Sequence, residues 1–303
     1  MLIMREIIIG NQSIQIKDYH CSNGNGYLPK DDGKLWLYVN LTDICNGRCP
    51  FCINPCRKSG VNPFDIQRFR KCLNRIREHV YGVSVTGGEP MLDPELLDAV
   101  ADVVVRECGH DQEMDIVTNG TGFQRVKDLR HLTDLYSIHL SRHRLTDEEN
   151  DRLFGFPSVS WEELRETISS LKDPGAVVLN CVLMRGGIDS LENISAYLEK
   201  AISVGVRNVS FIGMSKCNRW CEEYYIDPGE IQIKEDARFH IWSSYQDHDW
   251  CCCRSGSYEA NNRSIRFYMR GMGHETPDYT RQFVYTSDNR LLAGFGGKEI
   301  CLE

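Results

Sequence analysis

The chain has 303 residues, of which 41% are hydrophobic and 26% are charged, and its formal net charge is −8. These values are typical of a globular protein with room for one large domain, and they argue against general binding to nucleic acid. No apolar run approaches the roughly 20 residues of a membrane span, and the N-terminus lacks the pattern of a signal peptide. The sequence therefore predicts a cytoplasmic protein without membrane contact.

The predicted elements begin with a β-hairpin over residues 5–17 that turns at Gly10 and Asn11, within a lead-in over residues 1–34. Strands and helices then alternate. Apolar runs predict six strands, at residues 35–41, 82–86, 114–118, 135–141, 176–184 and 208–213. Helical signals lie between them: apolar residues at steps of three and four over 66–80, Asp93 as an N-cap before Pro94, and a Ser160/Glu163 capping box.

This alternation over residues 35–213 predicts a parallel sheet with right-handed crossovers, either an open doubly wound sheet or an incomplete barrel. Both arrangements place ligands at the carboxyl ends of the strands. Four unusual segments follow successive strands: the cysteine loop 45–52, GGEP at 87–90, NG at 119–120 and SRHR at 141–144. We expect them to converge on one site.

Residues 214–303 are predicted to form a β-rich C-terminal extension. A strand is indicated at 265–270, and residues 281–296 have the pattern of strands joined by a turn at Asp288 and Asn289. One domain with an extension is the simplest interpretation.

The cysteines carry the main chemical signal. The chain contains fourteen, and in a reducing compartment clustered cysteines are more often metal ligands than disulfides. Cys45, Cys49 and Cys52 follow one another at spacings of four and three. One alternative is a structural zinc site, which needs four protein ligands. Cys56 would then be the fourth ligand. Three ligands on a [4Fe-4S] cube would instead leave one iron open to another molecule.

The stretch CNGRCPFC resembles the C-x3-C-x-aromatic-C signature of the radical S-adenosylmethionine (SAM) superfamily, with Phe51 as the aromatic residue. The resemblance implies a partial (β/α)6 TIM-like barrel in which Cys45, Cys49 and Cys52 hold a [4Fe-4S] cluster and are catalytic through it. It further implies that SAM binds the open iron and is cleaved by one electron to methionine and a 5′-deoxyadenosyl radical, which abstracts hydrogen from a substrate. An electron donor such as a flavodoxin or a ferredoxin is implied as a partner.

The other strand ends resemble the family's cofactor-binding segments. The resemblance assigns SAM contacts to eight residues: Phe51, Gly87, Gly88, Glu89, Pro90, Asn119, Ser141 and Arg142. In this assignment the glycines let the ligand approach the main chain, and Glu89 offers its carboxylate to an ammonium group. Asn119 and Ser141 bond the ribose or carboxylate, Arg142 neutralises the carboxylate, and Phe51 lies beside the adenine.

Each of these segments also has an ordinary structural interpretation. GGEP alone is typical of a strand-to-helix turn, Asn119 before Gly120 is a common turn pair, and Ser141 with Arg142 can simply end a strand. The functional interpretation therefore depends on the cysteines.

The resemblance extends to the branch that contains the molybdenum-cofactor GTP cyclase and the peptide-modifying (SPASM/twitch) enzymes, many of which carry a second iron-sulfur cluster. Six C-terminal cysteines are candidate ligands for such a cluster: Cys217, Cys221, Cys251, Cys252, Cys253 and Cys301. The alternative is that they are small buried hydrophobic residues. The hairpin SDNRLLAGFGG has Gly294 near the position where those enzymes place a ligand cysteine.

The sequence favours a peptide substrate, with modification of the kind found in ribosomally made peptides (RiPP-type), because aromatic residues gather in the C-terminal third: Trp220, Tyr224, Tyr225, Trp242, Tyr245 and Trp250. The catalytic diglycine tail of the GTP cyclase has no match in the final residues GGKEICLE, so that activity is not expected. A nucleotide or other small metabolite is the alternative substrate. A noncatalytic metal-binding or redox-sensing protein is the alternative from another functional class.

Overall fold

The computed structural model describes residues 4–17, 34–54, 56, 59–109, 112–131, 137–247, 251–271, 279–280 and 282–300, without the side chains of 243–247 and 251–253. Within these ranges no helix is long and apolar enough to cross a membrane.

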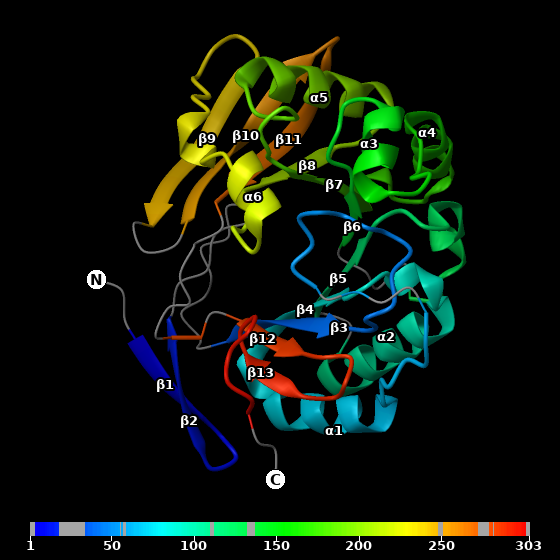
Figure 1. Cartoon of the computed structure of the whole chain (residues 1–303), viewed down its shortest axis with the longest axis vertical. Coiled ribbons are helices and arrows are strands. Elements are labelled where there is room, and N and C mark those ends of the chain that lie inside the picture. The colour runs from blue at the N-terminus through cyan, green and yellow to red at the C-terminus, as the bar shows by residue number, and fades with distance from the viewer. Residues whose placement is uncertain are drawn as a thin grey trace.

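The central feature is one curved sheet of eleven strands in the order β13-β12-β3-β4-β5-β6-β7-β8-β11-β10-β9 (Figure 1). Its six middle strands are parallel neighbours in chain order. They are β3 (Leu35–Asn40), β4 (Val80–Thr86), β5 (Glu113–Thr118), β6 (Ser137–Ser141), β7 (Val177–Val182) and β8 (Asn208–Ile212). The predicted parallel α/β sheet is confirmed, and because β13 and β9 lie at opposite edges the sheet is open.

The C-terminal strands extend both edges of this sheet. At one edge β11 (Arg263–Arg270) lies parallel to β8 and is followed by β10 (Cys251–Ala260) and β9 (Phe239–Asp247). At the other edge β12 (Gln282–Tyr285) lies parallel to β3 and pairs with β13 (Leu291–Ala293) through the predicted turn. The residues after β8 therefore continue the sheet and do not form a separate one.

The N-terminal hairpin consists of β1 (Met4–Ile9) and β2 (Gln12–Lys17), as predicted. Gly10 has φ 60°, a left-handed conformation that suits glycine in this two-residue turn. The hairpin meets the C-terminal part of the chain where the Thr280 backbone N–H donates to the Gln15 carbonyl at 2.7 Å.

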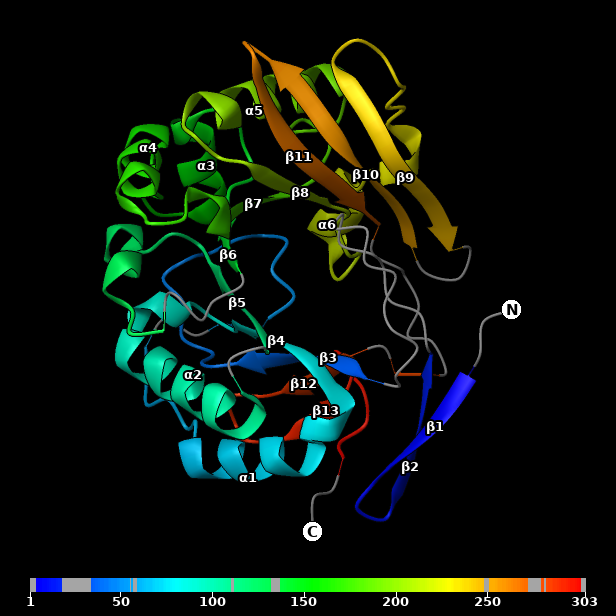
Figure 2. The ribbon, with the colours of Figure 1, turned by 180° about the vertical axis from the view of Figure 1, so that it is seen from behind.

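Five helices cover the outer face of the sheet in both views (Figures 1 and 2): α1 (Ile66–Ile76), α2 (Pro94–Cys108), α3 (Asp147–Phe154), α4 (Trp161–Ser170) and α5 (Leu191–Ser203). The predicted cap by Asp93 and the Ser160/Glu163 capping box are present. Predicted helix 66–80 ends earlier, because Arg77–His79 form a 3-10 turn before β4. The described residues form further 3-10 turns at Pro90–Leu92, Phe123–Asp128, Pro174–Ala176 and Pro228–Glu230.

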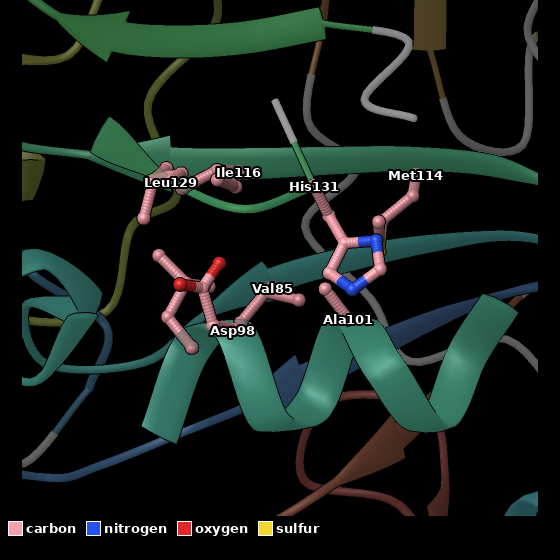
Figure 3. A pocket seen from close by; sticks show the side chains of 8 residues that line it. Val85, Asp98, Ala101, Met114, Ile116, Leu129 and His131 are labelled. Atoms are coloured by element: carbon pink, nitrogen blue, oxygen red, sulfur yellow. The ribbon is translucent and has the colours of Figure 1, made fainter. Parts of the chain in front are cut away.

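The two faces of the sheet differ in chemistry because successive strand residues point to opposite sides. The outer face is mainly apolar, and a small pocket between α2 and the sheet is lined by Val85, Ala101, Met114 and Ile116 together with Asp98 and His131 (Figure 3). On the inner face, buried polar residues make contacts across strands. Ser137 Oγ donates to Asp115 Oδ1 at 2.6 Å, and His139 Nδ1 lies 2.9 Å from Asn180 Oδ1.

Candidate functional site

The cysteine loop begins where β3 ends and gathers its thiols on one tight turn. Cys45 is 9% exposed, Cys49 is half-buried and Cys52 is exposed. A Cβ on Gly47 would lie 3.4 Å from Cys45 Sγ and 3.6 Å from Cys49 Sγ, so both sulfur atoms flank this glycine. The Cys52 backbone N–H donates to the Cys49 carbonyl at 3.2 Å, which closes the turn.

The electrostatics of the loop favour a thiolate at Cys52. The pKa of Cys52 is lowered to about 7, mainly by a hydrogen bond with the Cys56 thiol. The pKa of Cys56 is raised, because this thiol is hydrogen-bonded to both Cys45 and Cys52. Thiolates are the form that ligates metal, so the donor set fits an iron-sulfur cluster. Cys56 lies beside the same sulfur atoms.

The GGEP turn after β4 packs on residues 42–44, which lead into the cysteine loop. The Gly88 backbone N–H donates to the Thr42 carbonyl at 2.5 Å, and the Glu89 backbone N–H donates to the Ile44 carbonyl at 2.9 Å. A Cβ on Gly88 would lie 2.1 Å from the Ile44 oxygen, and one on Gly87, with φ 125°, would lie 2.5 Å from the Thr42 oxygen. Glycine is therefore required here by loop packing, a reason that the sequence did not indicate.

Glu89 links the GGEP turn to the TNG turn after β5. Its side chain is 1% exposed and accepts hydrogen bonds from Thr118 Oγ1 at 2.6 Å, the Asn119 backbone N–H at 2.7 Å and the Met91 backbone N–H at 2.9 Å. Burial raises its pKa to about 7, although these bonds oppose the rise. The carboxylate is thus bonded to three donors within the protein, and its contact with an ammonium group stays a prediction. Pro90, also buried, begins the next 3-10 turn.

Asn119 contacts the cysteine loop directly, as the convergence of strand ends predicted. Its Nδ2 donates to Asn46 Oδ1 at 3.0 Å and lies 3.8 Å from Cys45 Sγ. Asn46 Nδ2 donates in turn to Thr121 Oγ1 at 2.8 Å. The loops after β3, β4 and β5 therefore form one hydrogen-bonded unit around the first cysteine.

The two residues expected at the end of β6 have different positions. Ser141 is half-buried and, by strand alternation, shares the inner face with His139. Arg142 is completely buried: it donates to the Val159 carbonyl at 2.9 Å, pairs with Asp147 at 2.5 Å, and lies over the Trp161 ring at 4.1 Å. These contacts hold Arg142 among α3 and α4, so the expectation that it neutralises the SAM carboxylate does not fit.

Phe51 lies in a group of side chains that we call the aromatic cluster: Phe51, His143, Phe154, Trp220 and Tyr224. The Phe51 ring meets His143 edge-on at 5.0 Å and lies 6.2 Å from Trp220. Trp220 and Tyr224 stack at 4.4 Å on the short helix α6 (Arg219–Tyr224). The α6 cap holds this helix against the cysteine loop, since Asn218 Nδ2 donates to the Pro50 carbonyl at 2.9 Å.

His143 is a member of this cluster that the sequence did not single out. Its Nδ1 accepts from the Val182 backbone N–H at 3.1 Å, and its pKa is lowered to about 3, first by burial and then by Arg144 and Arg142. The ring is therefore neutral, with its proton on Nε2. The SRHR segment correctly indicated the end of a strand. The order of four adjacent polar residues does not show which of their side chains point toward Phe51.

Two of the six cysteines proposed for a second cluster lie beside this site. Cys217 Sγ and Cys221 Sγ are 3.4 Å apart, and Cys217 Sγ lies 4.0 Å from the Phe51 carbonyl. Cys251, Cys252 and Cys253 begin β10, but their side chains lie outside the description, as does all of Cys301. The second cluster stays a prediction. Among the aromatic residues, the Tyr245 side chain and Trp250 also lie outside the described part.

Comparison with known families identifies the same region. The model of the Radical SAM superfamily matches residues 39–198, just over half of the chain. This match includes the cysteine loop and the GGEP, NG and SRHR segments. It confirms the resemblance that the cysteine spacing indicated.

Individual relatives differ in what they act on. GTP 3′,8-cyclase of Aquifex aeolicus is 29% identical over 67% of this chain and 65% of its own, and PqqA peptide cyclase of Ruegeria pomeroyi is 26% identical over 60% and 49%. The structure of Streptococcus suis SuiB bound to S-adenosylmethionine shares the fold, with a TM-score of 0.50 and 16% identity over 71% of this chain and 46% of that one. The chain thus spans less than two thirds of the length of these relatives.

Proposed function

Because the chain belongs to the radical SAM superfamily, we propose that it is an enzyme that abstracts hydrogen from a peptide substrate. The cofactors of this superfamily are a [4Fe-4S] cluster and SAM. Together they supply a 5′-deoxyadenosyl radical by reductive cleavage of SAM. The observation that carries the proposal is the gathering of Cys45, Cys49 and Cys52 on a turn against which the GGEP and TNG segments pack.

Each part of the site has a role in this proposal. Cys45, Cys49 and Cys52 hold the cluster, and Gly87, Gly88, Pro90 and Asn119 shape the adjoining SAM site. Glu89 acts as a positioning residue through its bonds to Thr118 and Asn119. Ser141 faces the ligand from β6 and Phe51 borders the adenine, whereas Arg142 stabilises the outer helices. A radical that attacks most C–H bonds gains selectivity only from positioning, which these rigid strand ends provide.

A peptide substrate is favoured by the aromatic cluster and by the similarity to PqqA peptide cyclase. Exposed Trp242 on β9 adds an apolar surface at the far edge of the sheet. Large aromatic side chains give contact area to an extended ligand at low entropic cost.

A nucleotide is the second candidate substrate, because the similarity to GTP 3′,8-cyclase covers two thirds of this chain. A reducing electron donor such as a flavodoxin or ferredoxin and a cytoplasmic location belong to the same proposal, since the cysteine thiols must stay reduced. Cys217 and Cys221, whose sulfur atoms lie 3.4 Å apart, would be two of the ligands of a second cluster.

The proposal is tested by anaerobic reconstitution with iron and sulfide, followed by addition of SAM and dithionite. We expect about four irons per cluster, SAM binding, and release of methionine and 5′-deoxyadenosine. Bound zinc without SAM binding would instead support the noncatalytic alternative. Deuterium transfer into 5′-deoxyadenosine from labelled peptides or from labelled GTP then distinguishes the two substrate classes.

A further inference from the structure

Arg144 stands out as a charged side chain without an adequate internal partner. It follows β6 in the SRHR segment, and its Nη1 atom is buried and makes no hydrogen bond to any residue that the structure describes. Burial lowers its pKa, and this effect outweighs the attraction of Glu149 and Asp189. A buried guanidinium nitrogen in this state costs free energy unless a ligand satisfies it.

The nearby carboxylates make their hydrogen bonds elsewhere. Glu149 accepts from Thr146 Oγ1 at 3.0 Å. Asp189 accepts from the Gly186 backbone N–H at 2.7 Å and from Asn193 Nδ2 at 3.1 Å. Both carboxylates therefore attract Arg144 only through their charge. The N–H donors of the guanidinium are best satisfied by an acceptor in direct contact.

The guanidinium of Arg144 packs against the turn after β7. A Cβ on Gly187 would lie 1.5 Å from Arg144 Nη1 and 3.2 Å from Met184 Cγ, so the end of the arginine side chain lies directly against this glycine. The turn is fixed by bonds from the Gly187 backbone N–H to the Met184 carbonyl at 3.0 Å and from Asn193 Nδ2 to the Gly187 carbonyl at 2.7 Å. Arg144 therefore rests on a turn whose backbone is held by hydrogen bonds.

The surroundings place this guanidinium beside the aromatic cluster. Met184 packs in the same apolar group as Phe51 and Tyr224. Two further cations lie near Tyr225: Arg185 Nη2 donates to its carbonyl at 3.4 Å, and Lys216 Nζ lies 4.1 Å from its ring centre. The region next to Phe51 therefore carries positive charge in an otherwise acidic protein.

We propose that Arg144 binds an oxyanion group of the substrate, a carboxylate or a phosphate, next to the SAM site. The planar guanidinium matches both groups with paired hydrogen bonds. Arg185 and Lys216 strengthen the local positive field. This inference rests on the proposed function and names a chemical feature that its substrate must have. A carboxylate would come from an acidic peptide and a phosphate from a nucleotide.

The test is a titration of the reconstituted, SAM-bound protein at constant ionic strength, followed by tryptophan fluorescence, because Trp220 belongs to the adjacent cluster. The probes are pyrophosphate and a blocked tetraglutamate peptide. The variants are Arg144→Met and, as a matched control, Arg219→Met, which removes an equal charge from an exposed position on α6. We expect saturable binding of at least one probe to the wild type and the control, and at least tenfold weaker binding to Arg144→Met.

The probe that binds identifies the source of the oxyanion. Equal affinity of Arg144→Met and wild type, or no saturable binding of either probe, overturns the proposal. If the wild type binds the anion but does not cleave SAM, the proposed function is wrong and the anion site is still supported. A failure of the proposed function can therefore be distinguished from a failure of this inference.

Thermal unfolding gives an independent readout. Without anion, Arg144→Met should melt at the same temperature as the wild type or higher, because methionine removes a half-buried charge whose Nη1 atom makes no hydrogen bond within the described residues. The binding probe should raise the melting temperature of the wild type alone. A melting temperature of Arg144→Met below that of Arg219→Met would show a structural role for the guanidinium and overturn the proposal.

Discussion

The loops after β3, β4 and β5 and those after β6, β7 and β8 meet at the same end of the sheet, but different interactions hold them. The first group is joined by polar bonds of the main chain and of side chains: Gly88 and Glu89 donate to carbonyls just before the cysteine loop, and the Glu89 carboxylate accepts from the TNG turn. The second group has a main-chain bond from Arg185 to Tyr224, and its His143 and Trp220 rings pack against Phe51 of the cysteine loop. Polar bonds fix a cofactor site rigidly, whereas the packing of rings on Phe51 can be adapted to a particular substrate.

The largest expected effect concerns the first group. Cys49→Ala should lose cluster iron and reduce SAM cleavage to background, because no thiolate remains at the second ligand position. Cys72→Ala is the control: this thiol is buried in α1, and burial raises its pKa to about 12. It should keep iron and cleavage and lose roughly 1–2 kcal/mol of stability. Iron analysis and chromatography of 5′-deoxyadenosine decide, and persistent cleavage by Cys49→Ala would refute the ligand assignment.

A methyl group on the GGEP turn should separate the loop after β4 from the loop after β3. In Gly88→Ala the Cβ would lie 2.1 Å from the Ile44 oxygen, so the backbone must shift, and we expect a loss of about 3 kcal/mol in the free energy of unfolding. Gly296→Ala is the control, because nothing lies within 4 Å of its Cβ and only its φ of 69° is unfavourable, at a cost of about 1 kcal/mol. Equal losses in urea unfolding would contradict the packing argument.

Glu89→Gln examines the bond between the GGEP and TNG turns without changing the shape of the side chain. The amide oxygen can still accept from Thr118, but the amide nitrogen replaces Oε2 and faces the Asn119 backbone N–H, which is also a donor. We expect a loss of about 2 kcal/mol and weaker SAM binding. Glu78→Gln, at an exposed position, should stay within about 0.5 kcal/mol of the wild type. An unchanged SAM affinity would show that the link does not position the cofactor site.

The second group should show a pH dependence through His143. Its pKa falls from 6.5 to about 3 on folding, so the unfolded chain binds more protons between these values, and stability is present above pH 6.5 and is lost as the pH falls toward 3. Between pH 7.5 and 5.5 this loss is about 1.4 kcal/mol. His143→Gln should remove that part of the pH dependence, because glutamine can still accept from the Val182 N–H. His79→Gln, in the 3-10 turn before β4, is the control, and an equal change in both variants would contradict the assignment.

The sequence predicted one side of this end of the sheet better than the other. Cysteine spacing and paired glycines are local signals of a metal-binding turn and of close backbone approach, and the structure brings them together as expected. The contacts of Arg142 and Glu89 could not be predicted, because burial against Trp161 or Thr118 depends on residues distant in sequence. The same is true of His143 and Arg144, whose partners come from other loops.

The hairpin, the six central strands and β11 to β13 were predicted to within a few residues, but β9 and β10 were not predicted, and the strand order was only partly accessible. Alternating strands and helices indicate the six central parallel strands. No local pattern shows that β12 lies beside β3 and β11 beside β8. These pairings form because β3 and β8 are the outer strands of the central parallel sheet and can each accept one more neighbour.

The pairing of β12 with β3 also constrains how the protein folds. Gln282 pairs with Trp36, so the strand that leads into the cysteine loop lacks one neighbour until the residues around Gln282 have been synthesised. Contacts between segments so far apart in the sequence form slowly. We therefore expect the edge of the sheet beside the cysteine loop to be completed late in folding.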